Sequence, residues 1–483
     1  MRCARDRARI WPRRLAERPL APRDVAAAGL CIGCGACAKG DEALGWDRFG
    51  QLKPVGAWAG ERRRGFARVC PFSPAARDED EIATGRFPDA PERDGRIGSF
   101  ETAYVGHVAE DAFRAMGSSG GMVSWVATEL LRQGLVDGVA HVAPADPDRD
   151  GRFFDYRLSR SEAEIRRGAK SRYYPVEMSR VIEEMRLTPG RYAVVGAPCF
   201  IKAVNLLSAE DAVLGERIAF TLGLFCGHMK SARLVDSFAW QLGAPIGTVR
   251  AVEYRRKDPD RPANWYTAQL TLADGSERRQ DWWHLADGDW GAGFFQNSAC
   301  DYCDDVVAET ADIAFGDAWV EPYSSDGRGT NVVVVRNPEL RRLVSAAIAE
   351  GRLALDPVDA AFIANTQAAG LRHRREGLAY RLRIAPPRLP LRKRVAPGGG
   401  SLPLRRRLIY RCRRRIAIDS HRVLVLARAA GWPALYLRWA KAALRLYEAL
   451  AYLRGPLGGA FRRVGAVWRR KGSDDANHAL RHS

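Results

Sequence analysis

The sequence predicts an α/β protein whose body is built around a mixed β-sheet, with a cysteine-rich segment before it and a basic helical tail after it. Three observations predict this architecture. Apolar runs alternate with helical patterns between residues 100 and 335, four of the ten cysteines lie between residues 31 and 70, and residues 388–483 hold 23 Lys and Arg against four Asp and Glu. That excess equals the net charge of the whole chain, +19, so the preceding residues are electrically balanced.

Composition divides the 483 residues into four segments: 1–99, a body at 100–382, a Pro- and Gly-rich linker at 383–403, and the tail at 404–483. No uncharged apolar run reaches the roughly 18 residues of a membrane span. The first residues also lack the apolar stretch of a secretory signal. We therefore expect a cytoplasmic protein whose cysteines are reduced.

The body is expected to alternate strands and helices along the chain. Asp274-Gly275 lies between Trp265–Leu272 and Glu277–Trp283 and predicts an antiparallel hairpin inserted into this pattern. The other expected strands are Thr102–Val108, Val136–Val142, Arg191–Gly196, Arg217–Phe225, Ile313–Phe315 and Asn331–Val335. The expected helices are Gly121–Gln133, Ile201–Leu207, Ala232–Leu242 and those within 338–380, which complete the body.

The strongest local motif is Cys31-Ile-Gly-Cys34-Gly-Ala-Cys37. Gaps of two residues let three thiolates converge on one metal centre, and the glycines permit tight turns between them. The next cysteine is Cys70, and Pro71 after it matches the Cys-Pro ending of cluster motifs. These four cysteines predict a [4Fe–4S] cluster in a ferredoxin-like segment. A zinc site with four cysteines, or thiols that merely pack in the core, are the other interpretations.

A second set of cysteines is dispersed: Cys199 and Cys226 follow apolar strands, and Cys300 and Cys303 form a CxxC pair. Ligands in α/β sheets bind beyond the carboxyl ends of the strands, so these four thiols can close a second site. Single cysteines after strands are also common as buried core residues, and spacing alone leaves both interpretations open.

An ordered series of motifs resembles one known family. The series is Gly117-Ser-Ser-Gly-Gly121, Lys170-Ser-Arg-Tyr-Tyr174, Gly196-Ala-Pro-Cys199, Leu224-Phe-Cys226-Gly227, Cys300-x-x-Cys303 and Ala311-Asp-Ile-x-x-Gly316. It is similar to the beta subunits of coenzyme F420-reducing hydrogenase and formate dehydrogenase, and to plant 7-hydroxymethyl chlorophyll a reductase. The match runs from about residue 27 to about residue 370. The four N-terminal cysteines place the chain nearer the chlorophyll reductase branch.

The resemblance implies a flavoprotein body that binds FAD and a second [4Fe–4S] cluster. The cluster ligands that it implies are Cys199, Cys226, Cys300 and Cys303. Ser118, Ser119, Gly120 and Gly121 precede an expected helix, whose N-terminus favours a phosphate. The family pattern further implies flavin contacts by Lys170, Ser171, Tyr173 and Asn331.

Two departures from the family pattern limit what the resemblance implies. Phe200 follows the Pro-Cys motif where the family often carries Gln, which puts the substrate in doubt. No motif is diagnostic of F420. No catalytic residue is identified either, because His107, His141, His228 and His284 are isolated. Cys3 and Cys412 match no motif and are expected to be free thiols.

The tail contains an amphipathic pattern in residues 434–453, where Arg438, Lys441, Arg445 and Glu448 form one polar stripe. Its aromatic residues and the Arg clusters near residues 405–415 favour an anionic membrane surface, which implies a peripheral position on the inner membrane face. The other interpretation docks the apolar face on the body or on a second copy, as a homo-oligomer. Nucleic acid is not an expected partner, because the body carries no net charge.

The two cysteine sets and the family resemblance together predict an iron–sulfur flavoprotein oxidoreductase. Clusters move single electrons and a flavin converts them into hydride chemistry. We expect electrons to pass from a ferredoxin-like donor through two [4Fe–4S] clusters and FAD to an organic small molecule, with polysaccharide biosynthesis as one setting. The alternative is an electron-transfer subunit of a larger redox complex, such as an F420-linked hydrogenase or dehydrogenase. A zinc-bound interaction protein is the third hypothesis.

Overall fold

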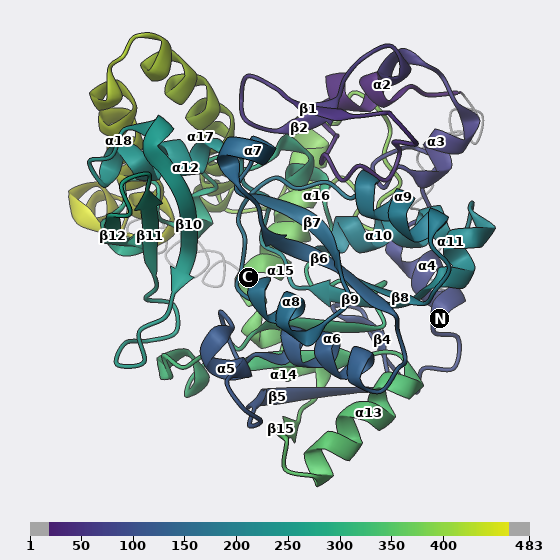
Figure 1. The fold of residues 1–483 in the computed structure, drawn as a ribbon. Coiled ribbons are helices and arrows are strands. Elements are labelled where there is room, and N and C mark those ends of the chain that lie inside the picture. The colour runs from purple at the N-terminus through teal and green to yellow at the C-terminus, as the bar shows by residue number, and fades with distance from the viewer. Residues whose placement is uncertain (1–18, 463–483) are drawn as a thin grey trace, which may run out of the picture. The chain divides into compact units, whose positions relative to one another are not determined.

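The computed structural model describes residues 19–462 (Figure 1). Within this range the chain forms two compact units. The larger unit contains residues 19–282 and 296–399. The smaller one, called the helical unit below, contains residues 283–295 and 400–462. None of the helices in the described range combines the length and the apolar character needed to cross a bilayer.

The larger unit is built on an eight-stranded mixed sheet in the order β15-β5-β14-β13-β9-β8-β6-β7. The four strands β6, β8, β9 and β13 run parallel, and the others pair antiparallel at the two sides. The strands are β5 (Thr102–Val108), β6 (Gly138–Pro144), β7 (Phe154–Ser159), β8 (Tyr192–Gly196), β9 (Ile218–Leu224), β13 (Ile313–Asp317), β14 (Asn331–Val335) and β15 (Leu353–Pro357). The predicted mixed α/β class is confirmed.

Helices cover both faces of this sheet. In β14, Val333 and Val335 pack into one apolar cluster while Val332 and Val334 pack into another, as the alternation of a strand requires. The first cluster includes residues of α6 (Met122–Arg132) and α13 (Pro338–Ala349), and the second includes residues of α14 (Ala360–Thr366) and α15 (Ala368–Arg374). Such two-sided burial explains why β14 is apolar throughout.

The helices of the larger unit are short. They are α2 (Pro22–Ala27), α3 (Arg64–Val69), α4 (Glu79–Arg86), α5 (Phe113–Met116), α6 (Met122–Arg132), α7 (Pro147–Asp150), α8 (Glu162–Arg167), α9 (Ser179–Leu187), α10 (Pro198–Ser208), α11 (Ala212–Arg217), α12 (Arg233–Gln241), α13 (Pro338–Ala349), α14 (Ala360–Thr366), α15 (Ala368–Arg374) and α16 (Glu376–Ile384). The small sheets are β1 (Leu44–Trp46) with β2 (Leu52–Pro54), β3 (Glu92–Asp94) with β4 (Gly98–Phe100), and β10 (Val249–Arg256) with β11 (Thr267–Leu272) and β12 (Glu277–Asp281). The predicted hairpin is the β11–β12 pair, and β10 extends it.

The helical unit is a hairpin of α17 (Leu404–Ala429) and α18 (Pro433–Ala451). The apolar face of α18 is buried within this unit, where Tyr436 is fully buried and donates a hydrogen bond to Asp287 at 2.7 Å. The ring of Phe295 packs on Tyr436, and its backbone N–H donates to Ser420. Residues 283–295 therefore supply part of the core of the helical unit.

Candidate functional site

The N-terminal quartet is the set of Cys31, Cys34, Cys37 and Cys70. The first three lie in the loop after α2, and Cys70 caps the carboxyl end of α3. All four line one cavity with an empty volume of about 410 Å³, whose other walls are mainly apolar. Four thiols around one cavity are a donor set that fits a cluster with one thiolate on each iron.

Two glycines shape the loop that carries the N-terminal quartet. Gly33 and Gly35 have φ angles of +76° and +80°. A Cβ on Gly33 would lie 2.6 Å from the carbonyl oxygen of Leu52, and one on Gly35 would lie 2.4 Å from Oε2 of Glu177. Both positions therefore exclude a side chain, which explains why glycine separates these cysteines.

The thiols of this quartet interact with one another. Burial, with smaller contributions from the charges of Cys31 and Glu177, raises the pKa of Cys34 to about 12. Burial also raises the pKa of Cys37, with contributions from Cys34 and Cys70. Lys53 donates from Nζ to the carbonyl oxygen of Cys31 at 2.5 Å and fixes the start of the loop. The raised pKa values mean that burial disfavours the thiolate. A bound metal centre would favour the thiolate again, because the thiolate is the form that binds metal.

The second quartet is the set of Cys199, Cys226, Cys300 and Cys303. Cys199 is the second residue of α10, directly after β8, and Cys226 follows β9. Since β8 and β9 are adjacent parallel strands, their carboxyl ends meet at one edge of the sheet. The CxxC pair reaches the same region from a 3₁₀ turn at Ser298–Tyr302.

Hydrogen bonds join Cys226 to the CxxC pair, because Arg374 donates to the carbonyl oxygens of both Cys226 and Cys300. Burial raises the pKa of Cys199, and the charges of Cys303, Cys226 and Cys300 raise it further. Burial likewise raises the pKa of Cys226 to about 12, to which Cys300 and Cys303 contribute. Three distant stretches of chain thus supply four thiols to one buried region.

The two quartets are neighbours. The charge of Cys34, from the N-terminal quartet, contributes to the raised pKa of Cys199 in the second. Tyr156 interacts with both thiols: burial raises its pKa, and the charges of Cys199 and Cys34 add to the effect. Its hydroxyl donates to the carbonyl oxygen of Val195 at the end of β8. A buried tyrosine therefore lies within electrostatic reach of both sets of thiols.

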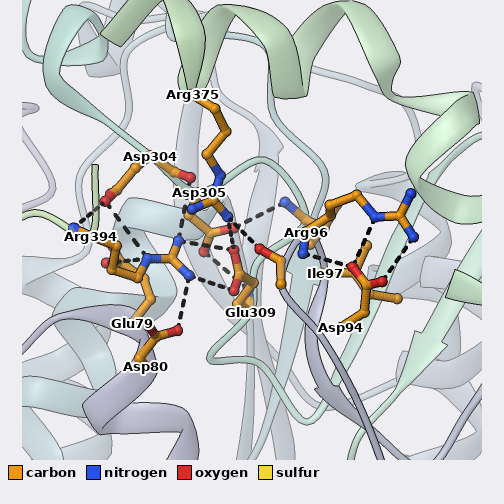
Figure 2. Close-up of polar contacts among 12 residues, drawn as sticks. Glu79, Asp80, Asp94, Arg96, Ile97, Asp304, Asp305, Glu309, Arg375 and Arg394 are labelled. Carbon is orange, nitrogen blue, oxygen red and sulfur yellow. Dashed lines mark hydrogen bonds and ion pairs between the residues drawn. The ribbon is translucent and has the colours of Figure 1, made fainter. Parts of the chain in front are cut away.

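A buried ionic network holds the loop after Cys303 (Figure 2). Arg394 donates through both terminal nitrogens to Glu309, at 2.6 and 2.9 Å, and its backbone N–H donates to Asp304. Lys393 pairs with Asp304 at 3.1 Å, and Arg375 pairs with Glu309 at 3.3 Å. Lys393 and Arg394 belong to the segment at 383–403 predicted as a linker, and here they are anchored on the larger unit.

The same network reaches the N-terminal segment. Arg394 contacts Asp80 of α4 at 3.2 Å. The neighbouring Glu79 pairs with Lys202 of α10 at 3.0 Å, and both side chains are buried. The surroundings of the two quartets are therefore joined by charged contacts as well as by packing.

A small cationic cavity lies beside the Gly117–Gly121 turn. Its empty volume is about 230 Å³, and Ser118, Ser119, Arg255 and Lys257 are among its lining residues. Lys257 donates to the carbonyl oxygens of Arg114, Ser119 and Arg328. Burial and the nearby positive charges of Lys170, Arg114 and Arg255 together lower the pKa of Lys257 to about 8. Asp317 also lines the cavity and offsets part of this positive charge. The remaining positive charge suits an anion.

The two glycines before α6 serve packing rather than line this cavity. A Cβ on Gly120 would lie 2.8 Å from both the backbone nitrogen and Oδ1 of Asn331. Gly121 has a φ of +87°, and a Cβ there would lie 2.6 Å from the carbonyl oxygen of Phe113. Asn331 accepts a hydrogen bond from the backbone N–H of Met122, so its side chain caps the start of α6.

The other residues implied as flavin contacts surround the cavity at various depths. Lys170 has a φ of +105°, unusual outside glycine, and pairs with Glu253 at 2.8 Å. The backbone N–H of Ser171 donates to the hydroxyl of Ser118. Tyr173 packs edge-on against Tyr254. Ser118 and Ser119 are thus the two implied contacts that line the cavity.

Sequence reasoning missed three basic residues near these sites. Arg255 and Lys257 come from the end of β10, where a basic run directly after an apolar strand was the available signal. Arg255 pairs with Asp317 at 2.9 Å. Arg374, at the end of α15, donates to backbone oxygens of the second quartet, and nothing in its local sequence distinguishes it. Long-range contacts alone define its role.

The structure does not reveal a catalytic histidine in the part of the chain that it describes. Burial lowers the pKa of His141 to about 4, and its Nε2 lies 2.8 Å from the hydroxyl of Ser159. These contacts indicate a structural residue. Within residues 19–462, no group of three or more His, Cys, Asp or Glu side chains, the two quartets included, is close enough together to hold a single metal ion. The thiols of the N-terminal quartet instead surround a cavity, as the ligands of a four-iron cluster do.

Comparisons with known proteins identify the family of the chain. Residues 103–183 match the N-terminal part, and residues 190–361 the C-terminal part, of the family described as coenzyme F420 hydrogenase/dehydrogenase, beta subunit. No curated protein matches the chain. Among solved structures, a chain of the F420-reducing [NiFe] hydrogenase complex from Methanosarcina barkeri is similar, with 17% identity and a TM-score of 0.46 over 60% of this chain and 95% of that chain. Since both parts of one family are matched in order over just more than half of its length, this protein belongs to the coenzyme F420 hydrogenase/dehydrogenase beta subunit family.

Proposed function

We propose that the protein is an electron-transfer oxidoreductase subunit that binds two [4Fe–4S] clusters and FAD. The N-terminal quartet is proposed to hold one cluster and the second quartet the other. The observation that carries the proposal is the cavity lined by all four thiols of the N-terminal quartet. Membership of a family of redox beta subunits supports the same function.

The donor chemistry favours iron–sulfur clusters over zinc. A tetrahedral zinc site draws four sulfurs to one ion at about 2.3 Å. A four-iron cluster takes one thiolate on each iron, so its ligands surround a cavity, as the N-terminal quartet does. The apolar walls exclude water from this cavity and help to tune a bound centre.

The flavin is proposed to bind at the cationic cavity. When bound, FAD would exchange two electrons with a partner and single electrons with the clusters. We assign this cavity to the diphosphate part of the dinucleotide, because Lys257 and Arg255 line it. Arg255 and Lys257 supply positive charge there, and Ser118 and Ser119 supply hydroxyl groups. The residues around it, Gly120, Gly121, Lys170, Ser171, Tyr173 and Asn331, are proposed to shape the site.

The proposal predicts a purified chain with about eight iron atoms and one flavin. Anaerobic iron and flavin analysis with electron paramagnetic resonance tests it. Cys34→Ser should remove about four iron atoms and leave FAD bound. Cys412→Ser, at a thiol of the helical unit outside both quartets, is the matched control and should change neither. Zinc in place of iron, or loss of both clusters with either variant, would contradict the proposal.

The partner decides between an electron-transfer subunit and an independent enzyme. We propose a ferredoxin-like protein as electron donor and a further redox subunit as acceptor. Under this proposal the purified chain oxidises reduced ferredoxin only when an acceptor protein is added. Steady turnover of an organic substrate by the chain alone, such as an intermediate of polysaccharide biosynthesis, would instead support the independent enzyme.

We further propose that the helical unit docks on an anionic membrane surface from the cytoplasmic side. Leu426 and Trp432, beside the turn between α17 and α18, are 61% and 51% exposed. Arg422, Arg428 and Arg438 around them are also exposed. Exposed aromatic and cationic residues together suit the interface of an anionic bilayer.

Vesicle sedimentation tests this docking. Binding to phosphatidylglycerol vesicles should exceed binding to phosphatidylcholine vesicles and should weaken with salt, because the attraction is electrostatic. Trp432→Ala should reduce it. Equal binding to both vesicle types would contradict the proposal, and a salt-resistant dimer in light scattering would favour a homo-oligomer instead.

A further inference from the structure

Arg374 is the last residue of α15, and its side chain is buried beside the second quartet. It is 2% exposed. Its guanidinium donates to the carbonyl oxygen of Gly227 at 2.6 Å, and to those of Cys226 and Cys300 at 3.4 Å each. The charged group therefore touches the backbone of two quartet members.

Arg374 has no carboxylate partner among the described residues, although carboxylates lie nearby. Asp301 accepts a hydrogen bond from Gln296 at 2.8 Å and lies 3.9 Å from Arg381. Asp304 pairs with Lys393 and Arg394. Asp301 and Asp304 thus have cationic partners of their own, and Asp305 accepts hydrogen bonds from the backbone N–H groups of Val307 and Glu309. A buried positive charge without a counter-ion is costly, so something else must offset it.

The thiols next to Arg374 are those of the second quartet. The backbone oxygens that Arg374 binds include those of Cys226, after β9, and Cys300, in the CxxC pair. A cluster held by the second quartet would therefore place its negative charge beside the buried guanidinium.

We propose that Arg374 is a positioning residue whose fixed positive charge compensates the second cluster and raises its reduction potential. This inference rests on the proposed function, namely on a cluster held by the second quartet. Reduction adds one electron and one negative charge to the site, forms or breaks no bond, and leaves Arg374 protonated. A nearby positive charge favours the more negative state, and net charge is a main determinant of cluster potentials.

The test is a dithionite titration of the cluster-loaded protein, followed by electron paramagnetic resonance. Arg374→Gln removes the charge but keeps amide donors, and Arg374→Lys keeps the charge but removes the planar fork. In Arg374→Gln the second cluster should become at least tenfold harder to reduce, a shift of about 59 mV for one electron. In Arg374→Lys the shift should be much smaller. The potential of the N-terminal cluster is the internal reference and should stay unchanged in both.

Arg336 provides a matched control, because it is equally buried and donates to backbone oxygens of Ile97, Val307 and Ala311. Arg336→Gln should shift the second cluster by less than Arg374→Gln. Equal shifts in Arg374→Gln and Arg374→Lys, equal shifts in the two Gln variants, or no shift at all would overturn the proposal.

Two further outcomes are also decisive. If Arg374→Gln fails to retain the second cluster, retention by Arg374→Lys supports charge compensation, and loss in both variants overturns it. If the wild-type protein lacks a second cluster, the proposed function itself fails. That result is distinct from a wild-type protein with two clusters whose potentials do not respond to Arg374.

Discussion

The N-terminal quartet and the second quartet assemble four thiols by different routes. Three members of the first lie within seven residues, and Gly33 and Gly35 turn the chain between them. The second gathers its members from strand ends and a distant turn. Local sequence therefore determines one site, and sheet topology determines the other.

Their electrostatic surroundings differ as well. Glu177 is a buried carboxylate beside the N-terminal quartet and raises the pKa of Cys34. Arg374 is a buried cation beside the second quartet. If both quartets hold clusters, as proposed, this contrast predicts that the cluster at the second site is easier to reduce than the cluster at the N-terminal site. Electrons would then pass from the N-terminal site to the second site.

The largest expected effect comes from removing one thiol at each site. Cys226→Ser should abolish the second cluster and leave Arg374 without its counter-ions, at a cost of about 3–5 kcal/mol in the free energy of unfolding. Cys34→Ser should lower the free energy of unfolding by less. The cation near the N-terminal quartet, Lys53, is partly exposed, so water can solvate its charge when the cluster is lost. Anaerobic thermal unfolding of both variants checks this difference. Arg374→Gln combined with Cys226→Ser should recover part of the loss, and strict additivity of the two would count against the pairing.

The loop of the N-terminal quartet gives the next largest effect. Gly35→Ala should destabilise the protein by about 1–3 kcal/mol, because it forces a side chain into a positive φ and against Glu177. The iron at the N-terminal site should be lost while that at the second site stays. Gly40→Ala is the control, since Gly40 also has a positive φ but faces open space. Similar iron losses in both variants would show that backbone strain alone explains the effect.

Lys257 in the cationic cavity is a further cation whose charge is expected to act on a bound cofactor. Lys257→Met should weaken FAD binding about tenfold, or ~1.4 kcal/mol. In the wild type, Lys257 is charged below its pKa of about 8 and neutral above it. The affinity for FAD should therefore be constant at low pH and fall as the pH rises past about 8. Because a bound anion stabilises the charged form of Lys257, the fall extends somewhat above pH 8. Fluorescence titration across pH measures both effects, and a pH dependence that survives in Lys257→Met would contradict this assignment.

The smallest effect is expected at Glu177. Its carboxylate accepts a hydrogen bond from the backbone N–H of Ser179 at 2.6 Å and lies 4.0 Å from Arg152, so its charge is partly offset. Glu177→Gln should raise the potential of the N-terminal cluster by less than a tenfold change in equilibrium constant, about 59 mV. A redox titration measures it. A shift of the N-terminal cluster to lower potential would contradict the assigned role of the negative charge of Glu177.

Sequence patterns predicted the central strands well. Thr102–Val108 and Asn331–Val335 are found with the predicted bounds, because short apolar runs directly reflect burial in the sheet. Strand β10 was missed, since the pattern of Val249–Arg256 ends in charged residues and its pairing partner lies beyond a long loop.

The surroundings of the sites were harder to predict than the thiols. Cysteine spacing is a local signal, and parallel strand ends explain how Cys199 and Cys226 meet. Lys393 and Arg394 lie in a Pro- and Gly-rich stretch, whose composition indicates a linker. Their partners Asp304 and Glu309 are more than eighty residues away in sequence. Ion pairs over that separation, like the hydrogen bonds of Arg374 to the backbone of Cys226 and Cys300, follow from the folded topology and leave no local pattern.

The central claim is that eight cysteines form two neighbouring quartets that bind iron. Anaerobic crystals of the cluster-loaded protein, measured at the iron absorption edge, test it most directly. The account predicts two separate groups of anomalous peaks, one within reach of Cys31, Cys34, Cys37 and Cys70, and the other within reach of Cys199, Cys226, Cys300 and Cys303. A single group, or peaks that appear only at the zinc edge, would contradict it.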